Sequence, residues 1–445
     1  MDVRLIFGPP GTGKTRLMVE LASEARSPLF LAFTKSAAKE ITKRCGSASS
    51  TIHAYAFAEL GLTRVEVVDQ MKLKTFGEMI GYEFTSDDDE MAQPTVGDVL
   101  LQMNQYMIAT CLSAGDVYEV FHPDEASYDM FVHFNASYDK WKESYGIVDF
   151  NDMLTRLLEK DVVFPYSELF VDEAQDLSPL QWRVIEKLAE QVEMVYVAGD
   201  DDQAVHSWAG ADPHGMAKFV KAHNARSRIL DQSHRVPAVV HDLAQSVISR
   251  VSSRVAKTYK PRTEQGLLLK YGRMDIAIEE AGLGSMILCR DKSTKSEAER
   301  WMIEQALPYV SNRSLFQSRY ATAIRELRKL QRGLPNKFNS KHLRKDVSAL
   351  QALEMDALEA VSIPPYYYDY FRNVDLDCAT PYVLSTIHAS KGQEADSVVL
   401  LNGMSDRVFG KMDDNEYRVW YVGVTRARKE LRVVHMDNPL GVLVQ

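Results

Sequence analysis

The sequence predicts an α/β fold made of two cores, each a parallel sheet covered by helices on both faces and interrupted by a mainly helical insertion. Short apolar runs of strand length alternate with amphipathic helical stretches along much of the chain, a pattern typical of parallel sheets packed between helices. Two regions break the alternation, from residue 60 to about 145 and from 317 to about 381, and we interpret both as insertions. A length of 445 residues is enough for several domains at ~150 residues each.

The expected elements can be placed along the chain in order. Strands are expected at residues 3–7, 29–33, 169–171, 194–198, 286–289, 383–386, 398–401 and 431–435. The first core is expected over 1–60 and 145–220, with its insertion at 61–144. The second core is expected over 221–316 and 382–445, with its insertion at 317–381. We expect the hinge between the cores near 219–228.

The composition is that of an ordinary globular protein, with 45% apolar and 26% charged residues. No apolar run approaches the ~18 residues of a membrane span, and no charged-then-apolar leader opens the sequence, so we expect neither secretion nor membrane insertion. The four cysteines lie far apart with no CxxC pair. This spacing argues against a zinc ribbon or an iron–sulfur cluster and indicates a reducing compartment.

The charge is unevenly distributed. A formal net charge of −10 disfavours nucleic-acid binding on average, because phosphate contacts need Lys and Arg. The local charge is strongly negative at residues 87–90 and strongly positive between residues 313 and 345. The positive stretch holds one acid, Glu326, against ten basic residues: Arg313, Arg319, Arg325, Arg328, Lys329, Arg332, Lys337, Lys341, Arg344 and Lys345. Net charge therefore does not exclude a polyanionic partner.

The turn after the first expected strand has the spacing of a phosphate-binding loop. Residues 8–15, GPPGTGKT, fit G-x-x-x-x-G-K-[ST] and lie between an apolar run and a helical stretch, as the motif requires. Such a loop curls its backbone N–H groups around a phosphate, and the following helix N-terminus adds a positive dipole. Lys14 would reach the β- and γ-phosphates and Thr15 would bind Mg²⁺. The remaining loop residues expected at the nucleotide are Gly8, Gly11, Thr12 and Gly13.

A pair of carboxylates follows an apolar run at residues 169–176, LFVDEAQD. An acid at the end of a strand beside the phosphate-loop strand can hold Mg²⁺, and the next acid can orient and deprotonate water. Asp172 would then be the acid on the metal side and Glu173 the general base. The less favoured alternative for the segment taken alone is that its acid caps the next helix. With the loop it predicts a nucleoside-triphosphate hydrolase, although small-molecule kinases share the loop.

Further blocks fall in an order that resembles the UvrD/Rep/PcrA group of superfamily-one DNA helicases. Besides the two segments above, these blocks are AFTKSAAKE (32–40), STIH (50–53), DFNDML (149–154), GDDDQAVHSWAGA (199–211), DQSHR (231–235), CRD (289–291), STIHASKGQE (385–394) and YVGVTRA (421–427). Each block alone is weak evidence for the family, whereas the presence of all the blocks in this order is specific evidence for it. The resemblance implies two RecA-like cores with ATP and Mg²⁺ bound between them and single-stranded DNA lying across them.

The resemblance also implies roles for single residues at the nucleotide. Gln203 would sense the γ-phosphate. Arg235 and Arg426 would contact it and stabilise charge on the transferring phosphoryl group. Glu394 would contact the ribose, and His234 would stack on the adenine where the family usually has Tyr. An isolated Gln or Arg is more often a surface residue, so these roles depend on the flanking residues.

For DNA, the resemblance implies base stacking on aromatic side chains and backbone contacts from hydroxyls and imidazoles. Stacking contributes ~1–3 kcal/mol per base and ignores sequence, which suits a translocating motor. The matching positions are Phe33, His53, His206, Trp208, Thr386 and His388. Phe33 could also be a core residue of its strand. The implied partners are single-stranded and forked DNA, together with single-strand-binding, replication or repair proteins. A cytoplasmic monomer is expected, from a bacterium or from a virus acting in the host cytoplasm.

The sequence departs from the family pattern at several points. The family carries an adenine-reading glutamine segment further upstream than the seven residues before Gly8 allow, so we expect weaker adenine selectivity. Ala209 stands where an Arg is usual, and Gln393 and Ala395 replace apolar and aromatic residues, which predicts either weaker DNA binding or altered coupling. The insertion in the second core is small. Its basic stretch is hypothesised to contact a DNA backbone, with a solvated helical face as the alternative.

Three functions fit these motifs. The first is an ATP-dependent helicase that moves along single-stranded DNA, 3′→5′ by the resemblance, and unwinds duplex DNA. The second is a translocase that displaces proteins without unwinding. The third is an ATP-dependent switch or loading subunit of a DNA-processing complex, but such a switch needs no stacking track like the one expected around Trp208. A nuclease is not expected, because no further carboxylate–lysine cluster is present.

Overall fold

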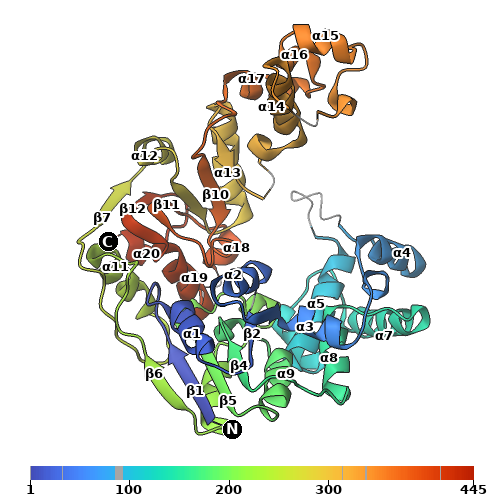
Figure 1. The fold of residues 1–445 in the computed structure, drawn as a ribbon, viewed down its shortest axis with the longest axis vertical. Coiled ribbons are helices and arrows are strands. Elements are labelled where there is room, and N and C mark those ends of the chain that lie inside the picture. Colours follow the sequence, from blue (N-terminus) through green and yellow to red (C-terminus); the bar gives the residue numbers. More distant parts are fainter. Residues whose placement is uncertain are drawn as a thin grey trace. The chain divides into compact units, whose positions relative to one another are not determined.

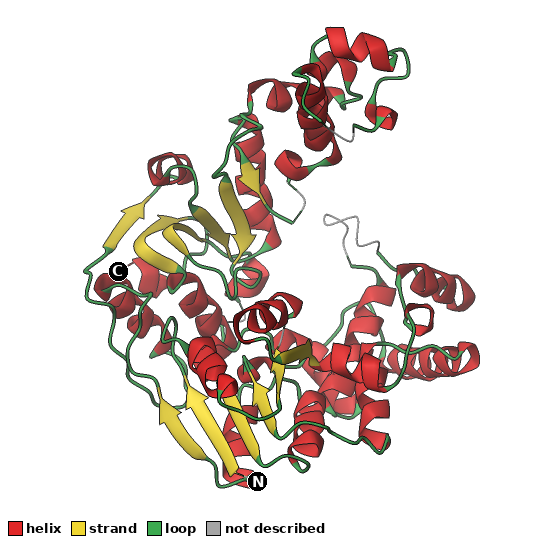
Figure 2. Cartoon of the chain, in the orientation of Figure 1, coloured by secondary structure: helices red, strands yellow, loops and turns green. Residues whose placement is uncertain are grey.

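The computed structural model describes residues 2–32, 34–85, 94–312, 314–335, 338–410 and 412–444. The chain divides into two compact units. The first comprises Met1–Gln232 and Arg254–Tyr259, and the second comprises Ser233–Ser253 and Lys260–Gln445. Each unit contains a parallel six-stranded sheet. Figures 1 and 2 show strands and helices in both units. The predicted α/β class with two parallel sheets is confirmed.

The sheet of the first unit has the strand order β3-β2-β4-β5-β1-β6. Its strands are β1 (Asp2–Phe7), β2 (Pro28–Ala32), β3 (Ala48–Thr51), β4 (Glu168–Val171), β5 (Met194–Gly199) and β6 (Arg226–Ile229). All of the pairings are parallel. We expected the strand that carries the carboxylate pair to lie directly beside the phosphate-loop strand. Instead, β5 lies between β1 and β4.

The helices of the first unit cover this sheet and form its insertion. Those nearest the sheet are α1 (Lys14–Ser23), α2 (Lys35–Cys45), α3 (Ile52–Glu59), α8 (Phe150–Glu159), α9 (Pro179–Ala189) and α10 (Gly215–Ala222). The insertion contains α4 (Gln70–Ile80), α5 (Val96–Thr110), α6 (Ala114–Phe121) and α7 (Tyr128–Tyr145). Short 3₁₀ turns are η1 (Arg64–Glu66), η2 (Ala174–Asp176), η3 (Asp201–Gln203) and η4 (Ser207–Ala209).

The strands of the first sheet divide their apolar residues between two faces. On β1, Val3, Leu5 and Phe7 pack with α3, α8, α9 and α10, whereas Ile6 packs with α1 and α2. The same alternation holds on β2, where Leu29 and Leu31 face one cluster and Phe30 faces the other. Because successive side chains of a strand point to opposite faces, a sheet covered on both sides needs apolar residues at every position. This is why its central strands read as largely apolar runs, interrupted in β1 by the exposed Arg4.

The insertion of the first unit has a hydrophobic core of its own. Phe76, Met103, Phe134 and Trp141 pack together there with their neighbours. It is therefore a helical subdomain attached to the sheet. The acidic run at 87–90 lies outside the described residues.

The sheet of the second unit has the order β7-β12-β11-β8-β10-β9, again parallel throughout. Its strands are β7 (Leu267–Tyr271), β8 (Met286–Cys289), β9 (Tyr309–Val310), β10 (Tyr382–Thr386), β11 (Ala395–Asn402) and β12 (Ala427–His435). Its core helices are α11 (Ala238–Ile248), α12 (Met274–Ala281), α13 (Lys292–Glu304), α18 (Asp406–Phe409), α19 (Asp414–Val424) and α20 (Gly441–Val444).

The insertion of the second unit is also helical, but it shares a hydrophobic cluster with one face of its sheet. Its elements are η5 (Leu315–Gln317), α14 (Arg319–Gln331), η6 (Ser340–His342), α15 (Ala349–Glu354), α16 (Ala357–Ala360), η7 (Pro365–Tyr367) and α17 (Tyr368–Asn373). Ile324 and Phe371 of the insertion belong to the same cluster as Ile287 and Leu384 of the sheet. The small insertion therefore packs as an extension of its core.

Two segments, residues 221–232 and Arg254–Tyr259, lie in a different unit from the expected one. Residues 221–232 were expected in the second core, yet β6 pairs with β1 in the first sheet and the first unit runs to Gln232. Four strands, β3, β6, β7 and β9, were not predicted. Among the described residues, no helix is both long enough and apolar enough to cross a membrane.

Candidate nucleotide and DNA site

The loop between β1 and α1 adopts a conformation that depends on its glycines. Gly11 and Gly13 have φ values of 71° and 84°, a region that other residues enter only at a cost. Gly13 is the N-cap of α1. A Cβ atom at Gly8 would lie 2.0 Å from Cγ of Lys14, so a side chain there would displace the lysine. The shape of the loop therefore requires glycine at positions 8, 11 and 13.

The polar side chains of this loop are held against its own backbone. The Lys14 side chain is buried and its Nζ donates a hydrogen bond to the Gly8 carbonyl at 2.7 Å. The Thr12 hydroxyl donates to the Pro9 carbonyl at 2.8 Å. The ammonium group therefore lies at the loop where the phosphates are expected.

The two predicted metal ligands are in contact. The Thr15 hydroxyl donates to Oδ2 of Asp172 at 2.8 Å, although β5 separates their strands. Burial, and then the charge of the adjacent Glu173 carboxylate, raise the pKa of Asp172 to about 6. Hydroxyl and carboxylate oxygens are the donors that Mg²⁺ prefers, and a cation would favour the ionised form of Asp172. These residues fit a magnesium site.

Glu173 has a strained backbone. Its φ of 53° lies in the left-handed region, which costs a residue other than glycine about 1–3 kcal/mol and persists only where the surroundings enforce it. The side chain is held by Gln175, whose Nε2 donates to Oε2 of Glu173 at 2.6 Å and to Asp176 at 3.1 Å. Gln175 in turn accepts a hydrogen bond from the Asp200 backbone N–H at 2.9 Å.

Gln175 is a residue that sequence reasoning missed. It is fully buried and connects the carboxylate pair at the end of β4 with the turn at the end of β5. Its place in the DEAQD run was the available signal, but nothing in that run says what its carboxamide contacts.

The turn after β5 brings the predicted γ-phosphate sensor close to the predicted stacking residue. The buried Gln203 donates to Oδ2 of Asp200 at 2.6 Å. Trp208 is 59% exposed, and its ring meets the His206 ring edge-on with centroids 6.4 Å apart. A large aromatic side chain left in solvent so near a buried polar turn is suited to stacking on a base.

A second aromatic pair lies in the same unit. The His53 ring contacts the Phe150 ring edge-on at 5.6 Å. Burial lowers the pKa of His53 to about 4 against the opposing charge of Asp149, so the imidazole is neutral at neutral pH. Phe150 is 59% exposed and was not singled out from the sequence. Phe33, the other predicted stacking residue of this unit, lies outside the described residues.

In the second unit, two residues with different predicted roles are paired with each other. Arg235 forms an ion pair with Glu394, which also lies 3.5 Å from Arg428. His234 is exposed beside Arg235. The predicted ribose contact and one predicted phosphate contact therefore share one site in this unit.

The remaining predicted residues of the second unit lie on β10 and after α19. Arg426 is buried, and it donates from Nε to the Val422 carbonyl at 2.9 Å and from Nη1 to the Gln393 carbonyl at 3.2 Å. Thr386 ends β10, and its hydroxyl accepts from the Ala389 N–H at 3.3 Å. His388 is half-buried in the turn that follows. The backbone carbonyls fix the guanidinium of Arg426 at the end of α19.

Two family models match the chain. The UvrD/REP helicase N-terminal domain matches residues 101–224, and the UvrD-like helicase C-terminal domain matches residues 381–434. The first match covers the carboxylate pair and the Gln203–Trp208 turn, and the second covers Thr386, His388, Glu394 and Arg426.

Similar proteins bear helicase names. The chain is 25% identical over 310 residues to the ATP-dependent DNA helicase PcrA of Leuconostoc citreum, covering 62% of this chain and 41% of that protein. It is 24% identical over 345 residues to PcrA of Bacillus subtilis (strain 168), covering 69% and 45%. It is 24% identical over 264 residues to the ATP-dependent DNA helicase Rep of Escherichia coli (strain K12), covering 52% and 39%.

The chain thus spans less than half the length of these curated relatives. The two family matches occur in the order N-terminal then C-terminal, one on each of the two parallel-sheet units. The chain therefore carries the sequence of a UvrD/REP helicase N-terminal domain in its first unit and of a UvrD-like helicase C-terminal domain in its second.

Proposed function

We propose that this protein is an ATP-driven motor that moves along single-stranded DNA in the 3′→5′ direction and unwinds duplex DNA. The observation that carries the proposal is a continuous hydrogen-bonded path within the first unit. It begins at Glu173, passes through Gln175 to Asp200, and ends at Gln203, in the segment of chain that leads to the exposed Trp208. A path of this kind lets a change at the phosphate alter the position of a base-stacking residue. The names of the relatives, ATP-dependent DNA helicases, support the same function.

The first unit supplies the groups for hydrolysis. Lys14 would neutralise the β- and γ-phosphates, and Thr15 with Asp172 would hold Mg²⁺, which when bound adds positive charge at the phosphate oxygens. Glu173 would accept a proton from the attacking water. Because Gln175 and the left-handed backbone fix the Glu173 carboxylate, it needs little reorganisation to act as a base. Arg235 and Arg426 remain the predicted phosphate contacts of the second unit.

The forked-DNA assay tests this proposal. Purified protein, ATP and Mg²⁺ are mixed with forks whose single-stranded tail is either 3′ or 5′, and strand release is measured. We expect release only from the fork with the 3′ tail, and none from the Lys14→Ala variant. ATP hydrolysis without strand release, together with displacement of a protein block, would favour the translocase. Hydrolysis that is indifferent to DNA would favour the switch and contradict the proposal.

Trp208→Ala is expected to uncouple hydrolysis from movement. Removing one base–aromatic stack costs ~1–3 kcal/mol, so affinity for single-stranded DNA should fall roughly 5- to 150-fold while hydrolysis without DNA stays measurable. Trp208→Phe keeps a stacking face and should retain most strand release. Normal strand release by Trp208→Ala would contradict a stacking role for this residue.

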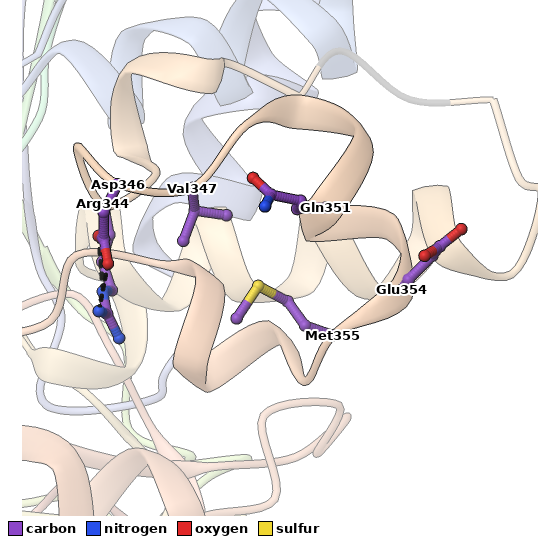
Figure 3. Close-up of a pocket in the computed structure, with 6 residues that line it drawn as sticks. All are labelled: Arg344, Asp346, Val347, Gln351, Glu354 and Met355. Carbon is purple, nitrogen blue, oxygen red and sulfur yellow. Dashed lines mark hydrogen bonds and ion pairs between the residues drawn. The ribbon is translucent and has the colours of Figure 1, made fainter.

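Only some of the cations in the basic stretch of the second insertion are available to contact DNA, so a test of the stretch should change those residues alone. Arg325 is part of the packing, because its guanidinium lies 4.4 Å from the centre of the Phe316 ring and donates to the Leu376 carbonyl. Arg344 pairs with Asp346 at 2.7 Å. This pair lines an open cavity of about 420 Å³ that is shown in Figure 3 and contains no predicted site residue. Lys329, Arg332, Lys341 and Lys345 are exposed and are the better candidates for DNA contact.

Charge reversal at Lys329, Arg332 and Lys345 is therefore expected to weaken binding to forked DNA. The slope of log affinity against log salt should become shallower by ~0.9 for each DNA phosphate that the variant no longer neutralises. The matched control reverses three exposed cations elsewhere in the same unit, Arg273, Lys292 and Arg300. Equal salt slopes for the two triple variants would show that the stretch is only a solvated face.

A further inference from the structure

A short segment between two parts of the second unit packs on the first. Residues Arg254–Tyr259, here called the strap, belong to the first unit, whereas the chain before and after them belongs to the second. The strap is held by Lys257, whose side chain is 1% exposed. Its ammonium lies 3.1, 2.5 and 2.9 Å from the carboxylates of three consecutive residues, Asp200, Asp201 and Asp202.

The three carboxylates need the strap in order to be buried. Asp200, Asp201 and Asp202 are at most 3% exposed, and a buried charge is tolerated only when it is paired. Burial by itself lowers the pKa of Lys257, but the charges of the three aspartates outweigh it and raise that pKa above its ordinary value. Lys257 therefore keeps its proton and provides a permanent counter-charge.

Other atoms of the strap bind the same turn. Nε of Arg254 donates to Asp202 at 2.7 Å, and the Val255 backbone N–H donates to Asp201 at 2.7 Å. The Val255 side chain packs on the hydrophobic core of the first unit. The strap is thus fixed to the turn by two cations, one backbone donor and an apolar contact.

The turn held by the strap is the one that carries Gln203 and is hydrogen-bonded to the predicted hydrolysis residues. Asp200 accepts from the Gln203 side chain and donates its backbone N–H to Gln175, which holds Glu173. A single residue, Asp200, therefore separates Lys257 from both the predicted phosphate sensor Gln203 and Gln175, which holds the predicted base.

The two residues directly before the strap are fixed to the second unit. Asp414, at the start of α19, accepts hydrogen bonds from the Ser252 backbone N–H at 3.0 Å, the Ser252 hydroxyl at 2.7 Å and the Ser253 backbone N–H at 3.1 Å. Arg418 of α19 donates to the Ser253 carbonyl at 2.6 Å. The same helix leads to Arg426.

We propose that the strap is a coupling link, in which Lys257 and Arg254 are positioning residues that transmit the state of the Asp200–Gln203 turn to α19 through the single peptide bond between Ser253 and Arg254. This inference rests on the proposed motor function. Since the anchors on either side of that bond involve adjacent residues, the chain between them has almost no slack. A displacement of the turn therefore moves α19, or breaks one of the two sets of contacts.

The test weakens each anchor separately. Lys257→Met removes one of the two cations that fix the strap to the first unit, and Asp414→Ala removes the acceptor in the second unit. Asp275→Ala is the control, because Asp275 is another acid in the first turn of a second-unit helix, α12. ATP hydrolysis is measured with and without poly(dT), with kcat and the KM for ATP determined separately, and strand release is counted per ATP hydrolysed. The melting temperature of each variant is recorded.

For Lys257→Met and Asp414→Ala we expect hydrolysis without DNA and the KM for ATP to stay within about twofold of the wild type. Stimulation by poly(dT) and strand release per ATP should fall 5- to 150-fold, the range of ~1–3 kcal/mol coupling energies. Asp275→Ala should behave as the wild type. If Lys257→Met does not fold, Asp414→Ala, whose side chain is only partly buried, decides the question.

The proposal is overturned if the folded variants keep wild-type stimulation, even with lowered melting temperatures, because the strap would then serve stability alone. It is also overturned if the KM for ATP rises in step with the loss of stimulation. Failure of the motor function is a separate outcome, since it would appear as a wild-type protein whose hydrolysis does not respond to poly(dT).

Discussion

Glu173→Gln is expected to lower kcat for ATP hydrolysis by roughly 10²- to 10⁴-fold, the usual contribution of a general base, while ATP still binds. The amide has the size of the carboxylate and retains an oxygen that can accept the hydrogen bond from Gln175, so the site should keep its shape. Only the capacity to take a proton from water is removed. Single-turnover hydrolysis and titration with a fluorescent ATP analogue measure the two effects separately.

Glu168→Gln is the matched control for this substitution. Glu168 begins the same strand, β4, and accepts hydrogen bonds from the Ser27 and Arg26 backbone N–H groups and from the Ser167 hydroxyl, away from the phosphate loop. Its variant should hydrolyse ATP at the wild-type rate. If Glu173→Gln retained more than about a tenth of wild-type kcat, another group would have to be the base.

Lys14→Ala should have a comparable effect but by a different route. Removal of a preorganised cation from a phosphate site lowers kcat by roughly 10²- to 10³-fold, and here the affinity for ATP should fall as well, because the ammonium neutralises charge already present on the bound nucleotide. The readouts are kcat, KM and ATP binding. The expected split is therefore that Lys14→Ala loses binding and turnover, whereas Glu173→Gln loses turnover alone.

Lys187→Ala controls for the removal of a lysine from the first unit. The Lys187 ammonium also donates to backbone carbonyls, those of Leu158 and Lys160 at 2.6 Å, but it lies on α9 and away from the loop. Wild-type turnover is expected for this variant. Tight ATP binding by Lys14→Ala would contradict the assignment of the loop to the phosphates.

The fold could be predicted where strands are buried on both faces. The central strands β1, β2, β4 and β5 of the first sheet read as apolar runs because both of their faces meet helices. The four strands that were not predicted, β3, β6, β7 and β9, lie at the edges of the two sheets. All four residues of β6 are exposed, and β3 reads ASST. An edge strand needs no continuous apolar face, so no hydrophobic pattern marks β3 and β6.

The candidate site was predictable where the residues are adjacent in sequence. The phosphate loop and the carboxylate pair each lie in one short segment, and the contact between Thr15 and Asp172 follows from their chemistry although 157 positions separate them. The strap could not be predicted in this way. Lys257 follows Asp201 by 56 positions, and nothing around it in the sequence differs from an ordinary solvated lysine. Only the fold shows that three buried carboxylates surround it.

The roles of Gln175 and Phe150 were missed for a related reason. A glutamine in a polar run and a phenylalanine at a helix start are both common, and their importance depends on which partner the fold brings to them. For Gln175 the partners are Glu173 and the Asp200 backbone, and for Phe150 the partner is His53.

The rate of ATP hydrolysis with and without poly(dT) tests the central claim most directly. The path from Glu173 to Gln203, just before Trp208 in the chain, predicts that single-stranded DNA raises kcat of the purified protein at least about 5-fold, the lower end of ordinary coupling between two sites, and that Trp208→Ala loses most of this increase. An unchanged rate at saturating poly(dT), in a protein that binds both ATP and the polymer, would contradict the account.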